Sequence, residues 1–265
     1  MINASSNNSI GIFDSGIGGT SIWKEIHALL PNEDTVYLSD SKNAPYGLKS
    51  KEEIIDLSIK NTELLIKEGA KIIVVACNTA TTNAIQYLRN NYQIPFIGIE
   101  PAIKPAAIKT KTNKIGILAT KGTLNSELFE HTSSKIDKHI KIIEQVGEGL
   151  VELIENNKIE SSEMSVLLKK YLSPMLEQKI DHLVLGCTHY PYLIPQIRKI
   201  IGEDIQIIDS GEAVAKQTKN ILSNLNLLNK ESKKSTTIFY INKDEVILEK
   251  ILLNYPNSII KKRDF

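Results

Sequence analysis

Short apolar runs alternate with longer amphipathic segments along almost the whole chain. The runs are rich in β-branched residues, which is typical of strands buried on both faces of a sheet, and the intervening segments have helical spacing. Strands are predicted at residues 10–13, 35–39, 71–77, 95–99, 114–118, 140–145, 181–187, 205–208 and 236–241, with a short one near the C-terminus. Helices are predicted at residues 21–30, 51–68, 78–90, 149–155, 162–178, 188–201, 211–227 and 244–253, and after Thr123. This alternation predicts an α/β fold with mainly parallel sheets.

Cys77 lies where a predicted strand ends and a predicted helix begins. In the stretch KIIVVACNTA, residues 71–80, an apolar run leads into the cysteine, and Asn78 and Thr79 then favour a helix start. In an open parallel sheet, ligands bind at this edge. The partial positive charge of a helix N-terminus also favours the thiolate form of a cysteine. Other helix ends are also marked by local residues: Ser50 and Glu53 predict a capping box at one helix start, and Gly69 predicts the end of that helix.

A second segment, DHLVLGCTH at residues 181–189, repeats this arrangement around Cys187, 110 residues further on (187 − 77). Two more landmarks recur in the same order: residues 10–13 match 115–118, and residues 97–100 match 207–210. The repeat predicts two similar α/β domains, related by a pseudo-twofold axis, with one cysteine of each at a shared cleft. Residues 10–100 with 212–265 would form the first domain, and residues 101–211 the second. The alternative is that βαβ units resemble one another in any α/β protein.

The composition narrows the class of protein. The chain has 265 residues, enough for one large or two small domains, and a formal net charge of +1, which gives no electrostatic reason to expect a nucleic-acid or membrane partner. The N-terminal MINASSNNS has no signal-peptide core, and no apolar run approaches transmembrane length. We expect a soluble, cytoplasmic protein. Two cysteines also do not make a secreted disulfide framework.

Two opposed thiols suit one kind of reaction. Inverting a stereocentre requires that a proton leave one face of a carbon and return on the other, so an acid/base group is needed on each face. Two groups of the same type let the reaction run in both directions with their roles exchanged. The pKa of a cysteine, about 8.5, is within reach of neutral pH after modest tuning. The resting site must then hold one thiolate and one thiol.

Other interpretations of the cysteines remain open at this point. A buried cysteine is often only a small apolar side chain. A Cys77–Cys187 disulfide is disfavoured inside cells, and two isolated cysteines with scattered histidines lack the spacing of a zinc site. A cysteine nucleophile with a histidine base is a further alternative, because His189 follows Cys187 closely.

Four motifs together resemble those of one enzyme family. They are FDSGIGG at residues 13–19, PYG at 45–47, ACNTA at 76–80 and GCTHYP at 186–191. Their order and spacing resemble the glutamate racemases of the aspartate/glutamate racemase superfamily, along nearly the whole chain from Ile10 to about Tyr240. Each motif is short, but the four in order are highly specific. The glycine-rich part of the first motif fits neither G-x-G-x-x-G nor the P-loop pattern.

The resemblance implies an activity and a set of partners. It implies the racemisation of L-glutamate to D-glutamate, which enters peptidoglycan, without pyridoxal phosphate, metal or other cofactor. A homodimer is also expected, because homodimers are common in the family. The rival activities are racemisation of aspartate or another small acid, a non-catalytic anion-binding module with structural cysteines, and a thiol-redox protein.

The resemblance also assigns roles to residues. Cys77 and Cys187 would be the opposed acid/base pair, with Asp14 assisting the first and His189 the second. The positions implied for substrate binding are Asp14, Ser15, Tyr46, Gly47, Asn78, Thr79, Thr188 and His189. Helix N-termini and hydroxyl groups at these positions can hold carboxylates, so an arginine clamp is not required.

A glutamate that assists the second thiol is the least well-defined match. The family places it at the end of a Cys-Pro-rich segment, and here the corresponding segment reads GEGLVELIE at residues 147–155. Glu155 is the candidate and Glu152 the alternative. Outside the resemblance, Glu155 would be a solvated helix residue, and the serines and threonines would be helix caps.

Overall fold

The computed structural model describes residues 5–231 and 235–265, so the predicted linker at 229–235 falls partly outside the described residues. Two separate sheets organise the chain, and every strand pairing recorded in them is parallel. The six-stranded sheet has the order β10-β9-β2-β1-β3-β4 and comprises β1 (Ser9–Asp14), β2 (Thr35–Ser39), β3 (Ala70–Val75), β4 (Phe96–Gly98), β9 (Thr237–Ile241) and β10 (Ser258–Lys262). The four-stranded sheet has the order β6-β5-β7-β8 and comprises β5 (Lys114–Ala119), β6 (Lys141–Val146), β7 (His182–Gly186) and β8 (Gln206–Ile208). The predicted α/β class with parallel sheets is confirmed.

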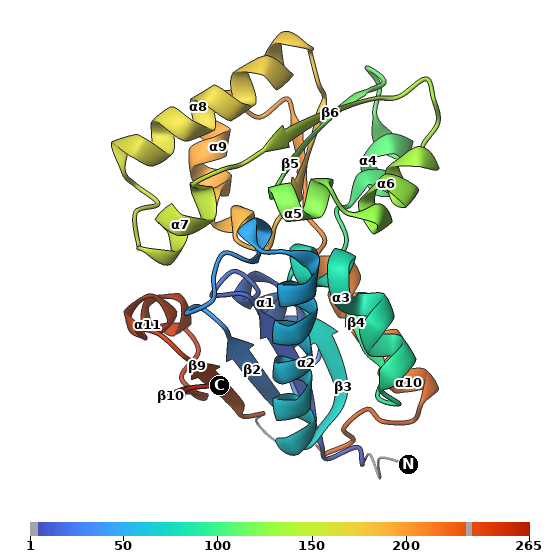
Figure 1. Cartoon of the computed structure of the whole chain (residues 1–265), viewed down its shortest axis with the longest axis vertical. Helices are drawn as coiled ribbons and strands as arrows, with labels where there is room; N and C mark the ends of the chain where they lie inside the picture. Colours follow the sequence, from blue (N-terminus) through green and yellow to red (C-terminus); the bar gives the residue numbers. More distant parts are fainter. Residues whose placement is uncertain (1–4, 232–234) are drawn as a thin grey trace.

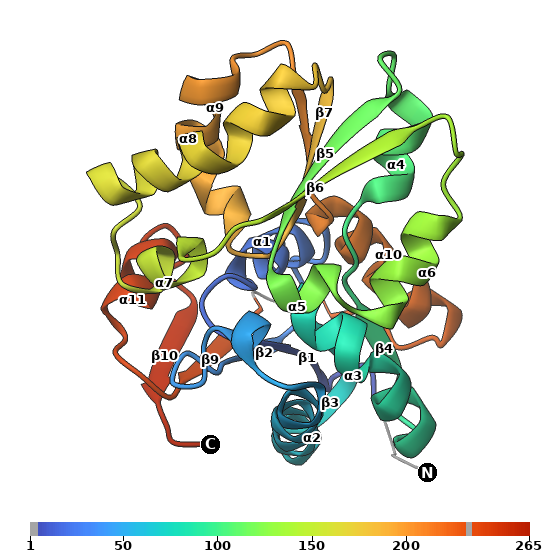
Figure 2. The same cartoon turned by 45° about the horizontal axis from the view of Figure 1, so that its top comes forward.

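Each sheet with its helices forms one lobe, as Figures 1 and 2 show. The large lobe, at the bottom of Figure 1, holds α1 (Thr20–Leu29), a 3₁₀ turn η1 (Tyr46–Leu48), α2 (Lys51–Lys67), α3 (Asn78–Asn91), α10 (Gly211–Asn224) and α11 (Val246–Leu252). The small lobe holds α4 (Ile103–Lys109), α5 (Lys121–Leu124), α6 (Glu127–Ser134), α7 (Leu150–Glu155), α8 (Ser162–Glu177), a 3₁₀ turn η2 (Tyr190–Leu193) and α9 (Ile194–Ile201). The lobes meet where α3 contacts α5 and α6. The residue limits predicted for two domains stay a prediction.

The central strands of the six-stranded sheet are buried on both faces, which explains their long apolar runs. In β3, Ile72 and Val74 pack in the core cluster that also contains residues of α1 and α10. Ile73 and Val75 point to the other face and pack with residues of α2 and α3. Successive side chains of a strand face opposite sides, so a central strand covered by helices on both sides is mostly apolar. The exception in β3 is Lys71, whose buried ammonium pairs with Glu33.

The two sheets share one strand order, which is the structural counterpart of the sequence repeat. Reading outward, β2-β1-β3-β4 in the large lobe corresponds to β6-β5-β7-β8 in the small lobe. The matched segments at residues 10–13 and 115–118 lie in β1 and β5, and the two cysteines follow β3 and β7. The cysteines therefore occupy equivalent places in two similar halves.

Local signals gave correct boundaries where capping chemistry was clear. Ser50 Oγ accepts a hydrogen bond from the Glu53 N–H at 3.2 Å, and Glu53 Oε2 accepts one from the Ser50 N–H at 2.9 Å, so the predicted capping box is present. Gly69 follows this helix with φ of +82°, a conformation that favours glycine. Helix α4 was not predicted, because Pro105 in so short a segment looks like a helix breaker, although proline is tolerated in a first helical turn. Among the described residues, no helix has both the length and the apolar character required to span a bilayer.

Candidate active site

A small cavity lies at the carboxyl ends of the central strands, between the two lobes. Its lining residues are Ser15, Pro45, Tyr46, Gly47, Cys77, Asn78, Thr79, Thr120, Val151, Cys187, Thr188 and His189. The structure thus brings both cysteines to one cavity, and neither forms a disulfide. The cavity measures about 10 Å³, room for roughly one water molecule. An amino acid is several times larger, so a substrate can enter only if lining groups move apart.

Cys77 lies at the junction of β3 and α3, as predicted, and is itself the N-cap residue of α3, a role that the sequence suggested for Asn78 or Thr79. Its Sγ accepts a hydrogen bond from the Ala80 N–H at 3.4 Å and lies 3.7 Å from Ser15 Oγ. The helix terminus favours the thiolate as expected, since the Ala80 N–H lowers the pKa of Cys77, but other influences outweigh it. Burial raises the pKa of Cys77 well above its ordinary value, the negative charge of Asp14 adds to this, and the Ala80 N–H only partly offsets both.

We expect Asp14→Asn to lower the pKa of Cys77, because the substitution removes the negative charge that opposes thiolate formation. The measurement is a pH titration of the ¹³Cβ chemical shift of cysteine in a Cys187→Ala background, where Cys77 is the remaining thiol. The midpoint should move to lower pH than in Cys187→Ala alone. A midpoint that stays in place or rises would contradict the assigned electrostatic influence of Asp14.

Cys187 follows β7, but no α-helix begins there. The Tyr190 N–H donates to the Cys187 carbonyl at 3.1 Å, η2 follows, and α9 begins only at Ile194. The predicted helix from residue 188 is therefore wrong in its first turns. Pro191 explains the delay, because an α-helix beginning at residue 188 would need the N–H of residue 191 to donate to the Cys187 carbonyl, and proline has no N–H. In place of a helix N-terminus, Cys187 has a histidine: its Sγ lies 3.9 Å from His189 Nδ1.

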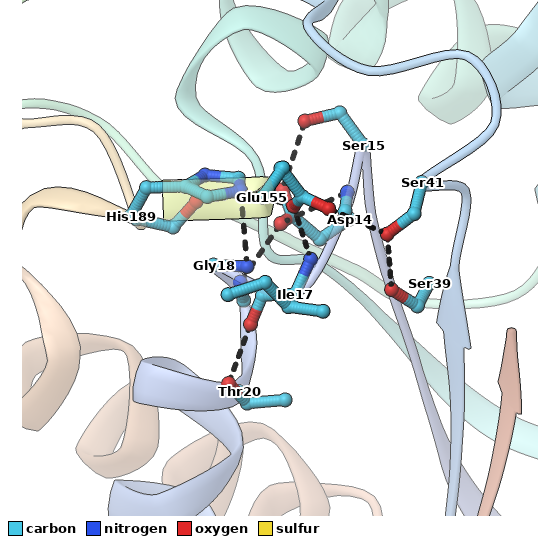
Figure 3. Close-up of polar contacts among 12 residues, drawn as sticks. Asp14, Ser15, Ile17, Gly18, Thr20, Ser39, Ser41, Glu155 and His189 are labelled. Atoms are coloured by element: carbon cyan, nitrogen blue, oxygen red, sulfur yellow. Dashed lines mark hydrogen bonds and ion pairs between the residues drawn. The ribbon is translucent and has the colours of Figure 1, made fainter. Parts of the chain in front are cut away.

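His189 and Glu155 form a buried pair (Figure 3). His189 contacts Cys187 through Nδ1 and Glu155 through Nε2. His189 Nε2 lies 2.6 Å from Glu155 Oε1, and the two side chains are 1% and 5% exposed. The Gly18 N–H also lies 3.2 Å from Nε2. One ring nitrogen cannot both donate to the carboxylate and accept from this N–H, so we assign the shorter contact as the hydrogen bond. Of the two candidate glutamates, Glu155 contacts His189, whereas Glu152 lines a neighbouring pocket of about 250 Å³.

The charges of this pair support each other. Burial alone would lower the pKa of His189, but the hydrogen bonds and charges of Cys187 and Glu155 outweigh it and raise the pKa well above its ordinary value. Burial alone would raise the pKa of Glu155, but His189, the Ile17 N–H and the Ser41 hydroxyl together lower it. These directions favour an imidazolium at His189, placed between the Cys187 sulfur and the Glu155 carboxylate.

Asp14 lies behind Ser15 rather than on the cavity wall. Its Oδ2 accepts from the N–H groups of Gly19 at 2.8 Å and Gly16 at 3.3 Å, and Ser15 Oγ lies 3.5 Å from its Oδ1. Burial raises the pKa of Asp14, and the positive charge of His189 opposes that rise. Each thiol is thus backed by a buried carboxylate through one intervening side chain: Ser15 before Asp14, and His189 before Glu155.

Among the predicted binding residues, Asn78 has the clearest vacant hydrogen-bonding capacity. Its side chain is buried, lines the cavity, and neither its Oδ1 nor its Nδ2 has a partner among the described residues. Buried amides rarely remain unpaired, so this one is a ready contact for a polar ligand. Thr188 Oγ1 lies 3.4 Å from Asp14 Oδ1. Tyr46 directs its hydroxyl away, donating to Asp40, so its ring and the adjacent Gly47 form the wall.

Two glycines of the FDSGIGG motif are required by close contacts, which is a different explanation from phosphate binding. A Cβ atom on Gly16 would lie 1.9 Å from Glu155 Oε1, and one on Gly18 would lie 2.2 Å from His189 Nδ1. The loop therefore passes against the His189–Glu155 pair, and only glycine permits that approach.

We expect Gly18→Ala to lower kcat/KM by about a hundredfold, because the new methyl group displaces His189 from Cys187. Steady-state kinetics with a thermal unfolding curve would check this. Gly211→Ala is the matched control, since its Cβ would meet the Glu25 side chain at 3.0 Å and Asp209 Oδ1 at 3.3 Å, and neither residue lines the thiol cavity. Equal activities of Gly18→Ala and the control would contradict the argument.

The motifs did not reveal every residue of the site. Thr120 and Val151 line the cavity, and Ser41 contacts Glu155 at 2.9 Å. Thr120 could have been predicted, because the offset of 105 residues between β1 and β5 makes it the position in the second half of the repeat that corresponds to Ser15 (120 − 15). Its hydroxyl lies 2.8 Å from Thr79 Oγ1 across the lobe boundary. Within residues 5–231 and 235–265, no group of three or more His, Cys, Asp or Glu side chains is arranged to hold a metal ion.

Both lobes present one thiol, backed by a buried carboxylate, to a common cavity, and this pairing would suit an isomerase that needs an acid/base group on each face of a carbon. The chain belongs to the Asp/Glu/Hydantoin racemase family, whose model matches residues 10–218.

It is 41% identical to the glutamate racemase of Herpetosiphon aurantiacus over 242 residues, 91% of this chain and 95% of that protein. The solved structure of glutamate racemase isoform RacE1 from Bacillus anthracis is similar, with a TM-score of 0.86, 32% identity and 98% of each chain covered. So is that of Escherichia coli glutamate racemase in complex with L-glutamate and the activator UDP-MurNAc-ala, with a TM-score of 0.83, 30% identity and coverage of 96% and 98%. The resemblance predicted from the four motifs is confirmed.

Proposed function

We propose that the protein interconverts L- and D-glutamate by a mechanism with two thiol bases. The observation that carries the proposal is the pair of cysteines, from equivalent strand ends of two similar lobes, in one buried cavity. The choice of glutamate rests on the relatives, which are glutamate racemases, one of them solved with L-glutamate bound.

The proposed reaction balances within the site. One thiolate removes the Cα proton of glutamate, the electron pair stays on carbon and delocalises into the α-carboxylate, and the opposite thiol delivers its proton to the other face. The C–H bond on one face is thereby replaced by one on the other, and the two thiols exchange protonation states. Cys77 serves one face and Cys187 the other, so the reverse reaction uses the same groups with exchanged roles.

The supporting groups have distinct proposed tasks. Asp14, through Ser15, tunes Cys77, while His189 and Glu155 tune Cys187. Asn78, Thr79, Thr188 and the backbone around Tyr46 and Gly47 hold the carboxylates and ammonium of the substrate. The N-terminus of α3 adds partial positive charge where negative charge develops. A cavity closed to water also limits loss of the transferred proton to solvent.

The biological setting follows from the product. D-glutamate made in the cytoplasm would supply peptidoglycan synthesis, with no cofactor needed for the reaction. We also propose that the protein acts as a homodimer, which sedimentation velocity over a concentration series would test.

The test of the function uses purified protein without added cofactor. L-glutamate is incubated in deuterated water while circular dichroism and Cα deuteration are followed together. Decay of the optical signal with deuterium entering the product enantiomer supports racemisation by two bases. A parallel panel of aspartate and other small amino acids tests the choice of substrate, and dominant turnover of aspartate would overturn the glutamate assignment. No turnover of any substrate would favour a binding role.

A further inference from the structure

Ser41 lies outside the substrate cavity but directly contacts the group behind His189. It follows β2, which ends at Ser39, and it is 2% exposed. Its Oγ donates a hydrogen bond to Glu155 Oε2 at 2.9 Å (Figure 3). Ser41 belongs to the large lobe and Glu155 to α7 of the small lobe, so this contact crosses the lobe boundary.

The two oxygens of Glu155 are held unequally. Oε1 lies 2.7 Å from the Ile17 nitrogen, which donates to it, and 2.6 Å from His189 Nε2. For Oε2, the hydrogen bond recorded among the described residues is that from Ser41. Ser39 Oγ lies 3.1 Å from Ser41 Oγ, and since Ser41 donates to the carboxylate, Ser39 is the donor to Ser41. Two buried hydroxyls in series therefore fix the second oxygen.

A separate pocket explains why this oxygen needs fixing. A cavity of about 310 Å³ on the other side of Glu155 is lined by Ile17, Ser41, Glu155, Asn156, Asn157, Lys243, Asp244, Val246 and Ile247. Glu155 lines this rear pocket and not the thiol cavity, whereas His189 lines the thiol cavity and not the rear pocket. Without the Ser41 hydroxyl, water in the rear pocket would solvate Oε2, and the carboxylate could turn away from His189.

We propose that Ser41 is a positioning residue for the proton transfer by Cys187: it holds the Glu155 carboxylate toward His189 and away from the rear pocket. This inference rests on the proposed racemisation for its kinetic consequence, but the geometry it claims is independent of it. Ser39 supports the same contact from one step further back.

The test compares Ser41→Ala with Ser41→Thr, which keeps a hydroxyl, and with Ser58→Ala. Ser58 is an equally buried serine of α2 whose hydroxyl bonds the Ile54 carbonyl, away from the site. Ser41→Ala should lower kcat by about ten- to a hundredfold, the range for a hydrogen bond to a charged group, with little change in KM because Ser41 does not line the cavity. The kcat of Ser41→Thr should recover most of the loss, the kcat of Ser39→Ala should lie between those of Ser41→Ala and the wild type, and the kcat of Ser58→Ala should match the wild type.

A second readout does not depend on turnover. The ring ¹⁵N shifts of His189 should titrate at lower pH in Ser41→Ala, because a less firmly held Glu155 stabilises the imidazolium less. The charged or titratable groups near this pair are Cys187 at the thiol cavity, Asp14 behind Ser15, Tyr37 of β2, and Lys243 and Asp244 at the rear pocket. An unchanged His189 titration, or a kcat loss equal to that of Ser58→Ala, would overturn the role of Ser41. If the wild-type protein racemises nothing but His189 still titrates at lower pH in Ser41→Ala than in the wild type, the proposed function is overturned and the positioning role stands.

Discussion

Cys77→Ala and Cys187→Ala are each expected to lower racemisation by about a thousandfold, the scale of a lost acid/base group, and to do so in both directions. Both directions fail because each needs one thiol to remove the proton and the other to return it. The two cysteines line the same cavity from opposite lobes, so neither can take over the face served by the other. Initial rates from pure L-glutamate and pure D-glutamate measure the effect.

Exchange without inversion is the matched control for the cysteine variants. The remaining thiol can still remove and return a proton on its own face of Cα. In deuterated water, each variant should therefore exchange the Cα proton of one enantiomer for deuterium while the optical rotation persists. The two variants should favour opposite enantiomers. Substantial racemisation in both directions by either alanine variant would refute the two-base mechanism.

The largest effect on stability is expected from Lys71→Met. Lys71 begins the apolar run of β3, its side chain is 0% exposed, and its Nζ lies 2.6 Å from Glu33 Oε2, whose side chain is 3% exposed. Removing the ammonium leaves a buried carboxylate without its counter-charge, which should lower the free energy of unfolding by about 3–5 kcal/mol. Urea unfolding followed by circular dichroism measures this.

Two further variants separate the buried charge from the lost side chain. Lys71→Met with Glu33→Gln should recover part of the loss, because no unpaired charge is then buried. Lys216→Met removes an exposed partner of Glu212 one helical turn away and should change stability by well under about 1 kcal/mol. If Lys71→Met were no more destabilising than Lys216→Met, the buried pair would contribute no more than a surface pair.

The sequence was most informative where local patterns determine structure. Apolar runs with helix-starting residues after them located β3, α3 and the place of Cys77, because burial and capping act over a few neighbouring residues. The delayed helix after Cys187 shows the limit of the repeat, since Pro191 changes the local backbone without changing the strand before it.

Contacts between residues that are distant in the sequence explain what the sequence did not reveal. Ser41, Glu155 and His189 are far apart in the chain and meet only because β2, α7 and the segment after β7 converge. The direction of the Cys77 pKa shift depends on burial and on Asp14, neither of which a helix-capping pattern encodes. The requirement for Gly16 likewise comes from a carboxylate contributed by the other lobe.

The division of the Glu155 contacts between the lobes has a consequence for timing. Glu155 and His189 belong to the small lobe, but the Ile17 N–H and the Ser41 hydroxyl that hold the carboxylate come from the large lobe. Any separation of the lobes wide enough to admit an amino acid would strip both donors from Glu155. The hydrogen bonds that hold Glu155 against His189 would then form each time the lobes close and break each time they open. Closure would both enclose the substrate and complete the groups that support Cys187, so in an open enzyme Cys187 would lack that support.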